Sequence, residues 1–278
     1  MWVGDAPPRL YAYTGGRSFD AARPAIVFLH GAQSDHSVWI LQSRYLAHHG
    51  WSVLAFDLPG HGRSEGKAAT RVEDIADTVA GVLSTLRLAR VLVAGHSMGS
   101  LLALEVGRRL GGTPLAGVAL LGTSFPMRVS DALLDAARDD PPAAMRMINA
   151  WSHRPGLAAF APRPGCPGPG FNVVVQNLRL MERIEQLNGR DVLENDFTAC
   201  AAYHGGIEAI RALACPALFV LGAADQMTPP RAARGLIDAC ADPTVETLPL
   251  AGHAMMSEDP DGVRRALLRF AMRVMPAG

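Results

Sequence analysis

A serine between two glycines, in the run Gly95-His96-Ser97-Met98-Gly99, is the strongest chemical signal in the chain. The run follows the apolar segment Val91–Ala94 and precedes a segment with helical periodicity. A tight strand-to-helix turn of this kind strains the serine and projects its hydroxyl above a sheet. The helix N-terminus that follows offers free N–H groups to a developing oxyanion. This context predicts that Ser97 is a nucleophile rather than an ordinary turn residue.

A serine hydroxyl needs a base, and the base needs a group that orients it and stabilises its charged form. Among nine histidines, His253 stands after the last expected strand and before the last expected helix, where an imidazole can reach the edge of the sheet. Asp225 follows the apolar run 217–221. The order Ser97, Asp225, His253 is the order of nucleophile, acid and base that accompanies this turn. We therefore predict a Ser-His-Asp triad.

Short apolar runs alternate with amphipathic stretches along the chain. The runs are the length of strands buried on both faces of a parallel sheet, and they cover 25–29, 52–56, 91–94, 116–121, 217–221 and 244–248. Helical spacing of apolar residues is found around 72–86, after 97, at 232–240 and at 263–270. This alternation predicts an α/β protein with a mostly parallel, doubly wound sheet covered on both faces. Ahead of residue 24, we expect 10–14 to be the only strand.

Residues 124–205 interrupt this alternation. They hold 8 of the 20 prolines, and within them 161–170 is nearly all proline and glycine, which predicts a loop. Helical patterns flank that loop at 131–151 and 172–186. We predict a helical lid at 124–205 inserted into a core made of 1–123 and 206–278. Four methionines in the lid suit either ordinary packing or an adaptable pocket lining.

The motifs together resemble the α/β-hydrolase fold superfamily, in particular its lid-bearing members with a serine nucleophile. They lie in order from Pro24 onward and comprise His30-Gly31, Asp57-Leu58-Pro59-Gly60-His61-Gly62-Arg63-Ser64, Gly95 to Gly99, Gly222 to Asp225 and Gly252-His253. The segment from Asp57 to Ser64 is interpreted as structural, with Asp57 and His61 hydrogen-bonding locally. His96 is interpreted as a packed neighbour of the nucleophile. The short N-terminus suggests that the sheet lacks the first antiparallel strand usual in this family.

The resemblance implies an oxyanion hole made of two backbone N–H groups. One belongs to Met98, the residue after the nucleophile, and the other to Ala32, in the loop after His30-Gly31. Candidate substrate contacts are Gln33 in that loop and Trp151 and Met181 in the predicted lid. No metal and no cofactor is implied.

Composition excludes several other classes of protein. Of 278 residues 49% are hydrophobic, which is too many for a disordered polymer, and 26 Lys and Arg balance 26 Asp and Glu. Nothing in that balance suggests a nucleic-acid or anionic-membrane partner. Neither a signal peptide nor a membrane-spanning run is evident, and the spacings of the four cysteines predict neither a zinc site nor a disulfide framework. We expect a cytoplasmic protein whose partner is a small-molecule substrate, and homodimerisation through the lid or an edge strand stays open.

The expected reaction is hydrolysis of a carboxylic ester of a small to medium apolar substrate, through an acyl-enzyme on Ser97. The same triad also serves hydrolysis of a carbon–carbon bond in a diketone, lactone opening, amide cleavage and cofactor-free perhydrolysis, and the motif does not separate these reactions. Epoxide hydrolases and haloalkane dehalogenases of the superfamily use an aspartate where Ser97 stands. The rival from another class is a receptor-like ligand-binding protein on the same fold, and the intact triad favours an enzyme.

Overall fold

The structure is a computed structural model that describes residues 1–111, 114–156 and 169–276. Its centre is an eight-stranded sheet in the order β1-β2-β4-β3-β5-β6-β7-β8, in which neighbouring strands from β4 to β8 run parallel. Because these strands are parallel, their carboxyl ends meet at one edge of the sheet. The strands are β1 (Trp2–Val3), β2 (Leu10–Tyr13), β3 (Ala25–Leu29), β4 (Ser52–Phe56), β5 (Val91–His96), β6 (Leu115–Leu121), β7 (Ala217–Gly222) and β8 (Pro243–Leu248).

The six predicted strands of this sheet are confirmed, and so is the doubly wound α/β class. All five residues of β3 and all six of β5 are buried, as expected for strands covered on both faces. Strand β8 instead alternates between exposed and half-buried residues before its last position, because it lies at the edge of the sheet.

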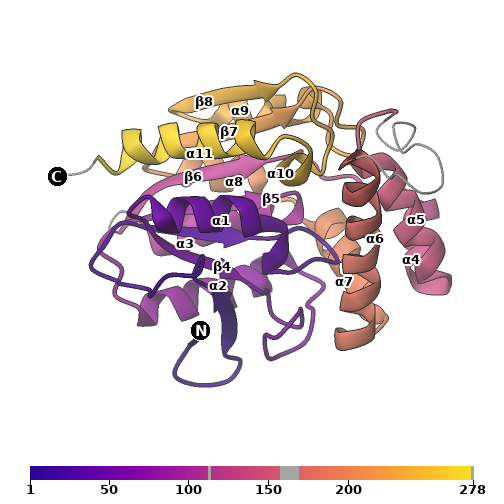
Figure 1. Ribbon diagram of the computed structural model, residues 1–278, viewed down its shortest axis with the longest axis horizontal. Helices are drawn as coiled ribbons and strands as arrows, with labels where there is room; N and C mark the ends of the chain where they lie inside the picture. Colours follow the sequence, from indigo (N-terminus) through magenta and orange to yellow (C-terminus); the bar gives the residue numbers. More distant parts are fainter. Residues whose placement is uncertain (112–113, 157–168, 277–278) are drawn as a thin grey trace.

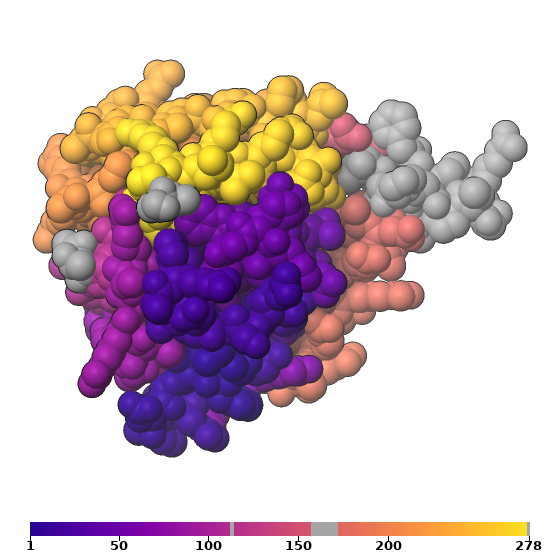
Figure 2. Space-filling view, turned by 60° about the vertical axis from the view of Figure 1, so that its left-hand side comes forward, coloured from indigo at the N-terminus to yellow at the C-terminus, as the bar shows by residue number. Residues whose placement is uncertain are grey.

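Helices cover the two faces of the sheet in two separate layers (Figure 1). One layer holds α1 (Ile40–His48), α10 (Met255–Glu258) and α11 (Pro260–Val274). The other holds α2 (Val72–Thr85), α3 (Met98–Leu110), α8 (Gly206–Ala212) and α9 (Arg234–Ala239). Short 3-10 turns span His36–Trp39 and Pro230–Ala233. Figure 2 shows the C-terminal segment in yellow lying against the N-terminal third of the chain, the result of α1 and α11 sharing one face.

The N-terminal end of the sheet differs from the prediction. Two strands stand there rather than one, and both are antiparallel: β1 pairs with β2, and β2 pairs with β4. The Met1 amino group also donates to the Ala12 carbonyl, at 2.6 Å. The expectation of a missing antiparallel strand was wrong, because a two-residue strand carries no periodicity that a sequence reading can detect.

Of the helices that the described residues form between β6 and β7, all but α8 lie beside the sheet rather than on its faces (Figure 1). They are α4 (Asp131–Asp139), α5 (Pro141–Ser152), α6 (Pro169–Asn188) and α7 (Asp191–Ala202). They share a small apolar core of their own, which includes Leu133, Met145, Met181 and Phe197. The boundaries 124–205 and the role of a lid stay predictions. Most of the predicted loop 161–170 lies outside the described residues, and its last two residues begin α6.

One predicted helix over 131–151 is in fact two. Asp140 ends α4 and caps α5, where its carboxylate accepts the Ala143 N–H at 3.1 Å. Two prolines follow at the first positions of α5, where their missing N–H groups cost nothing. The same two residues cannot continue α4, so the chain turns at this point.

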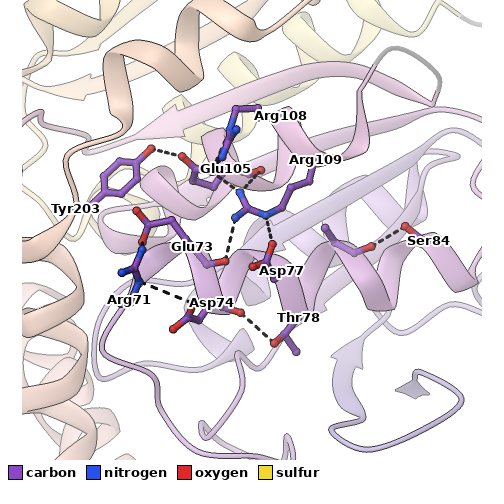
Figure 3. A network of polar contacts seen from close by, with 11 residues as sticks. Arg71, Glu73, Asp74, Asp77, Thr78, Ser84, Glu105, Arg108, Arg109 and Tyr203 are labelled. Carbon is purple, nitrogen blue, oxygen red and sulfur yellow. Dashed lines mark hydrogen bonds and ion pairs between the residues drawn. The ribbon is translucent and has the colours of Figure 1, made fainter.

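A charged network fastens α2, α3 and the end of α7 to one another (Figure 3). Glu105, almost fully buried, accepts hydrogen bonds from Arg108, Arg109 and the hydroxyl of Tyr203. Arg109 also reaches Asp77 on α2.

Within the described residues, no helix combines the length and the apolar character that a membrane crossing requires.

Candidate active site

Ser97 lies at the junction of β5 and α3 in a strained backbone conformation, with φ 55° and ψ −122°. Its N–H donates to the Leu121 carbonyl at 2.9 Å, which ties the turn to the neighbouring strand. The flanking glycines are sterically required. A Cβ on Gly95 would lie 1.8 Å from the Gly99 carbonyl oxygen, and a Cβ on Gly99 would lie 2.3 Å from the Leu29 carbonyl oxygen. A strained residue held by its surroundings is typical of a functional site.

A buried carboxylate and imidazole form the second part of the site. His253 Nδ1 lies 2.9 Å from Asp225 Oδ2, and both residues are 4% exposed. Burial alone would raise the pKa of Asp225, but the neighbouring His253 and hydrogen bonds from Thr228 lower it to about 2. The carboxylate is therefore charged at neutral pH and accepts the Nδ1 proton. This leaves Nε2 as the nitrogen that is free to accept a proton from a hydroxyl.

Thr228 completes the support of this pair. Its hydroxyl donates to Asp225 Oδ2 at 2.8 Å and lies 3.1 Å from His253 Nδ1. The backbone N–H groups of Met227 and Thr228 both donate to Asp225 Oδ1 at 2.8 Å. The orientation of the carboxylate is thus set by the loop that carries it.

His96, next to the serine, packs as predicted. Its Nε2 lies 2.8 Å from the His253 carbonyl oxygen, and the two rings are 4.6 Å apart. Burial and the neighbouring His253 lower its pKa to about 3. His96 is therefore neutral, and it holds the backbone that carries His253.

Two cavities open beside Ser97, and His253 and Ala32 line both of them. The larger has a volume of about 570 Å³ and the smaller about 190 Å³. Side chains of the larger cavity include Ser34, Ser37, Ile148, Arg179 and Met181. Side chains of the smaller cavity include Met127, Leu133, Trp151, Phe197 and Cys200. A substrate at Ser97 can therefore extend in two directions.

The sequence model of the Alpha/beta hydrolase family matches residues 26–266. The chain belongs to this family. The strained serine turn and the Asp–His pair of this α/β hydrolase thus lie on the fold that the sequence motifs predict.

Curated relatives resemble this hydrolase to different extents. The pimeloyl-[acyl-carrier protein] methyl ester esterase of Pectobacterium atrosepticum is 26% identical over 285 residues, which cover 94% of this chain and 98% of that one. The (E)-2-((N-methylformamido)methylene)succinate hydrolase of Acinetobacter baylyi is 38% identical over 82 residues, which cover 29% of this chain and 31% of that one. An acetyltransferase component of the acetoin cleaving system of Pseudomonas putida is 29% identical over 254 residues, 88% of this chain and 62% of that one. The chain thus spans less than two thirds of the length of the last two relatives.

A solved structure supports the fold over the full length. The enol-lactonase of Burkholderia xenovorans LB400 superposes with a TM-score of 0.80 at 22% identity, covering 98% of this hydrolase and 100% of that protein. At this identity the likeness establishes the shared fold.

The predicted triad residues lie close together, but their catalytic roles stay predictions. Ser97 and His253 line the same two cavities, while the described residues contain no hydrogen bond from the Ser97 hydroxyl to the imidazole. Such bonds are often long before a substrate binds. Met98 is the first residue of α3, so its N–H has no intrahelical acceptor. Ala32 lies beside Ser97 in both cavities.

The three candidate substrate contacts have different positions. Met181 lines the larger cavity and Trp151 the smaller. Gln33 lines neither of these two cavities. Its side chain is 1% exposed and donates from Nε2 to the Met181 carbonyl at 3.1 Å. The Gln33 side chain thus turns toward α6, and its contact with a substrate stays a prediction.

Sequence reasoning missed the long-range partners of the segment Asp57 to Ser64. His61 reaches Asp196 on α7, with 2.9 Å between Nε2 and Oδ2, besides its predicted local contact with the Pro59 carbonyl. Asp57 accepts hydrogen bonds from the backbone N–H and the ring of His36, at 2.9 and 2.6 Å. No local pattern around Asp196 or His36 signals these contacts, since each bridges segments that are distant in sequence.

Proposed function

We propose that this α/β hydrolase is a carboxylic ester hydrolase that works through an acyl-enzyme on Ser97. The observation that carries the proposal is the strained Ser97 turn beside the buried His253–Asp225 pair, at a site with two cavities. Full-length similarity to a methyl ester esterase supports the same class of reaction.

In the proposed mechanism, Ser97 Oγ attacks the ester carbonyl carbon while His253 Nε2 takes the hydroxyl proton. The negative charge that develops on the carbonyl oxygen is stabilised by the N–H groups of Met98 and Ala32. His253 then gives its proton to the departing alcohol, and the acyl group stays on Ser97. A water molecule, deprotonated by His253, attacks the acyl carbon; the bond to Ser97 Oγ breaks, His253 returns its proton to Oγ, and the acid leaves. Asp225 remains ionised throughout and stabilises the imidazolium, in keeping with its lowered pKa.

The two cavities define the proposed substrate. Met127, Leu133 and Phe197 line part of the smaller cavity and suit a small hydrocarbon group on one side of the ester. The larger cavity is lined by two arginines and by no acidic side chain. Arg183 pairs with Asp35 at 2.5 Å, whereas no carboxylate of the described residues lies within 4.0 Å of Arg179. A medium-sized group that carries a polar or anionic end fits this side.

The test is active-site labelling with a fluorophosphonate probe, combined with rates on p-nitrophenyl esters of increasing chain length. We expect the wild type to be labelled at Ser97 and to hydrolyse short esters, and Ser97→Ala to lose labelling and at least about 10⁴-fold in kcat. Ser84→Ala, an exchange of the same type on α2, serves as the control and keeps both. An unlabelled wild type, or hydrolysis that survives Ser97→Ala, contradicts the proposal. Lactones and vinylogous diketones in the same panel distinguish the rival reactions.

A further inference from the structure

The loop that carries Ala32 holds a second strained residue. In the described part of the chain, the non-glycine residues at positive φ are Gln33, Arg87 and Ser97. Gln33 has a φ of 50° and directly follows Ala32. A glutamine pays an energetic cost for this left-handed conformation, so something outside the loop must hold it.

The peptide between Ala32 and Gln33 is held at both of its polar groups. Its N–H, on Gln33, donates to Asp196 Oδ2 at 2.8 Å. Its carbonyl, on Ala32, accepts the Ser34 hydroxyl at 3.1 Å. The Gln33 side chain adds the bond to the Met181 carbonyl described above. Helices α6 and α7 therefore fix the conformation of a loop that belongs to the sheet edge.

Asp196 accepts the Gln33 N–H next to a buried histidine. The carboxylate and His61 are both fully buried, and His61 Nε2 lies 2.9 Å from the same Oδ2 atom. The other ring nitrogen of His61, Nδ1, faces the Pro59 carbonyl oxygen at 3.0 Å. Because both nitrogens face oxygen acceptors, both must carry a proton, and His61 is a cation. Burial opposes this charge, but Asp196 outweighs it and the pKa of His61 is raised.

The neighbouring His30 is neutral, which keeps the charge on His61. The Nε2 atom of His30 accepts the Leu58 N–H at 3.0 Å, so it carries no proton. Burial and the charge of His61, 5.0 Å away between ring centroids, lower the pKa of His30 to about 4. Asp196 and His61 thus form a close, fully enclosed pair.

We propose that Asp196 is a positioning residue for ester hydrolysis: its carboxylate, paired with His61, fixes the Ala32–Gln33 peptide and thereby aims the Ala32 N–H at the oxyanion. This inference rests on the proposed function. It extends the site to α7, which contributes no group to the reaction itself but sets the geometry of one of the two oxyanion donors. A displacement of a reacting or stabilising group by about 1 Å can cost about 10²-fold in rate.

The variant Asp196→Asn tests the role with little change in volume. An amide cannot keep His61 charged. Neutral His61 retains the Nδ1 proton for the Pro59 carbonyl, so its Nε2 becomes an acceptor. If the amide NH₂ turns to Nε2, it faces the Gln33 N–H, which then loses its acceptor. We expect kcat on a p-nitrophenyl ester to fall about 10-fold to 100-fold and KM to change less than about 3-fold.

The matched control is Tyr203→Phe at the end of α7. It removes the hydrogen bond of 2.8 Å to Glu105 (Figure 3), another buried contact of this helical segment with the core. Neither residue lines the two cavities beside Ser97. We expect Tyr203→Phe to keep kcat within about 3-fold. A trifluoromethyl ketone forms an oxyanion when the serine adds to it, so its affinity reports on the oxyanion hole. We expect this affinity to fall in parallel with kcat/KM in Asp196→Asn and to be retained in Tyr203→Phe.

A second pair of variants keeps the test valid if Asp196→Asn does not fold. Gln33→Gly and Gln33→Val both lose the bond to the Met181 carbonyl, but only glycine accepts a φ of 50° without cost. We expect Gln33→Val to have a kcat at least about 10-fold below that of Gln33→Gly.

The outcomes separate this inference from the proposed function. If the wild type hydrolyses esters but Asp196→Asn matches it, or loses no more kcat than Tyr203→Phe, the positioning role is refuted and the proposed function stands. A loss confined to KM, or equal rates for the two Gln33 variants, refutes it as well. If the wild type is neither labelled at Ser97 nor active on esters, both ideas fall together.

Discussion

The sharpest prediction concerns the addition of one methyl group at Gly95. In Gly95→Ala, the new Cβ would stand 1.8 Å from the Gly99 carbonyl oxygen, while real Cβ contacts essentially never fall below 3.0 Å. Strand β5 and the first turn of α3 must therefore separate by about 1.2 Å (3.0 − 1.8). Ser97 lies between these two points, so its hydroxyl moves by a similar distance relative to His253. A misplacement of this size costs about 10²-fold in rate, and we expect that loss in kcat/KM.

Gly81→Ala is the matched control, since it adds the same atom. Gly81 lies exposed in α2, and a Cβ there meets nothing within 4 Å. Replacing a helical glycine by alanine stabilises a protein by about 0.5–1 kcal/mol. We expect Gly81→Ala to keep wild-type kcat/KM and to raise Tm by about 1–4 °C.

The assay is hydrolysis of a p-nitrophenyl ester together with fluorophosphonate labelling and thermal unfolding by circular dichroism. A folded Gly95→Ala protein with less than about 5-fold loss in kcat/KM would refute the reasoning, because the turn would then tolerate an atom that the geometry excludes. If Gly95→Ala and Gly81→Ala behaved alike, close packing of the turn would not be what holds Ser97.

Other expectations follow from the same site. Thr228→Val removes the hydroxyl that bonds Asp225 Oδ2, and we expect about a 10-fold loss in kcat, measured against wild type on the same ester. The pKa of Asp225 is lowered from 3.8 to about 2, so the ionised carboxylate contributes about 2 kcal/mol to the free energy of unfolding at any pH above its unfolded pKa. This contribution is lost as pH falls through about 2. Urea unfolding measured between pH 2 and 6 should show the loss, and the Asp225→Asn variant should not. Arg179→Gln should lower kcat/KM for an ester with a terminal carboxylate about 5-fold or more relative to its neutral analogue, whereas Arg190→Gln, an exposed arginine outside both cavities, should not. Equal effects of the two arginine variants on this ratio would argue against an anionic end in the larger cavity.

Local signals in the sequence determined the strands and the serine turn. The run 25–29 matches β3 residue for residue, and 52–56 matches β4. Strands buried on both faces must be continuous apolar runs, which can be read without knowing their neighbours. The turn at Ser97 is local too, because Gly95 and Gly99 are needed for contacts within a few residues and with one adjacent strand. The places of Asp225 and His253 came from the order of motifs in a known family.

Only the tertiary structure decided what surrounds these residues. Asp196 stands 163 residues from Gln33 and 135 from His61, and the three meet because α7 lies against the loops that follow β3 and β4. Gln33 itself shows the difference: its loop suggested a substrate contact, while packing against α6 turned its side chain away from both cavities. Periodicity reports which face of an element is buried. It does not report which buried polar groups will face one another, because each such pair depends on how separate elements are brought together by the fold as a whole.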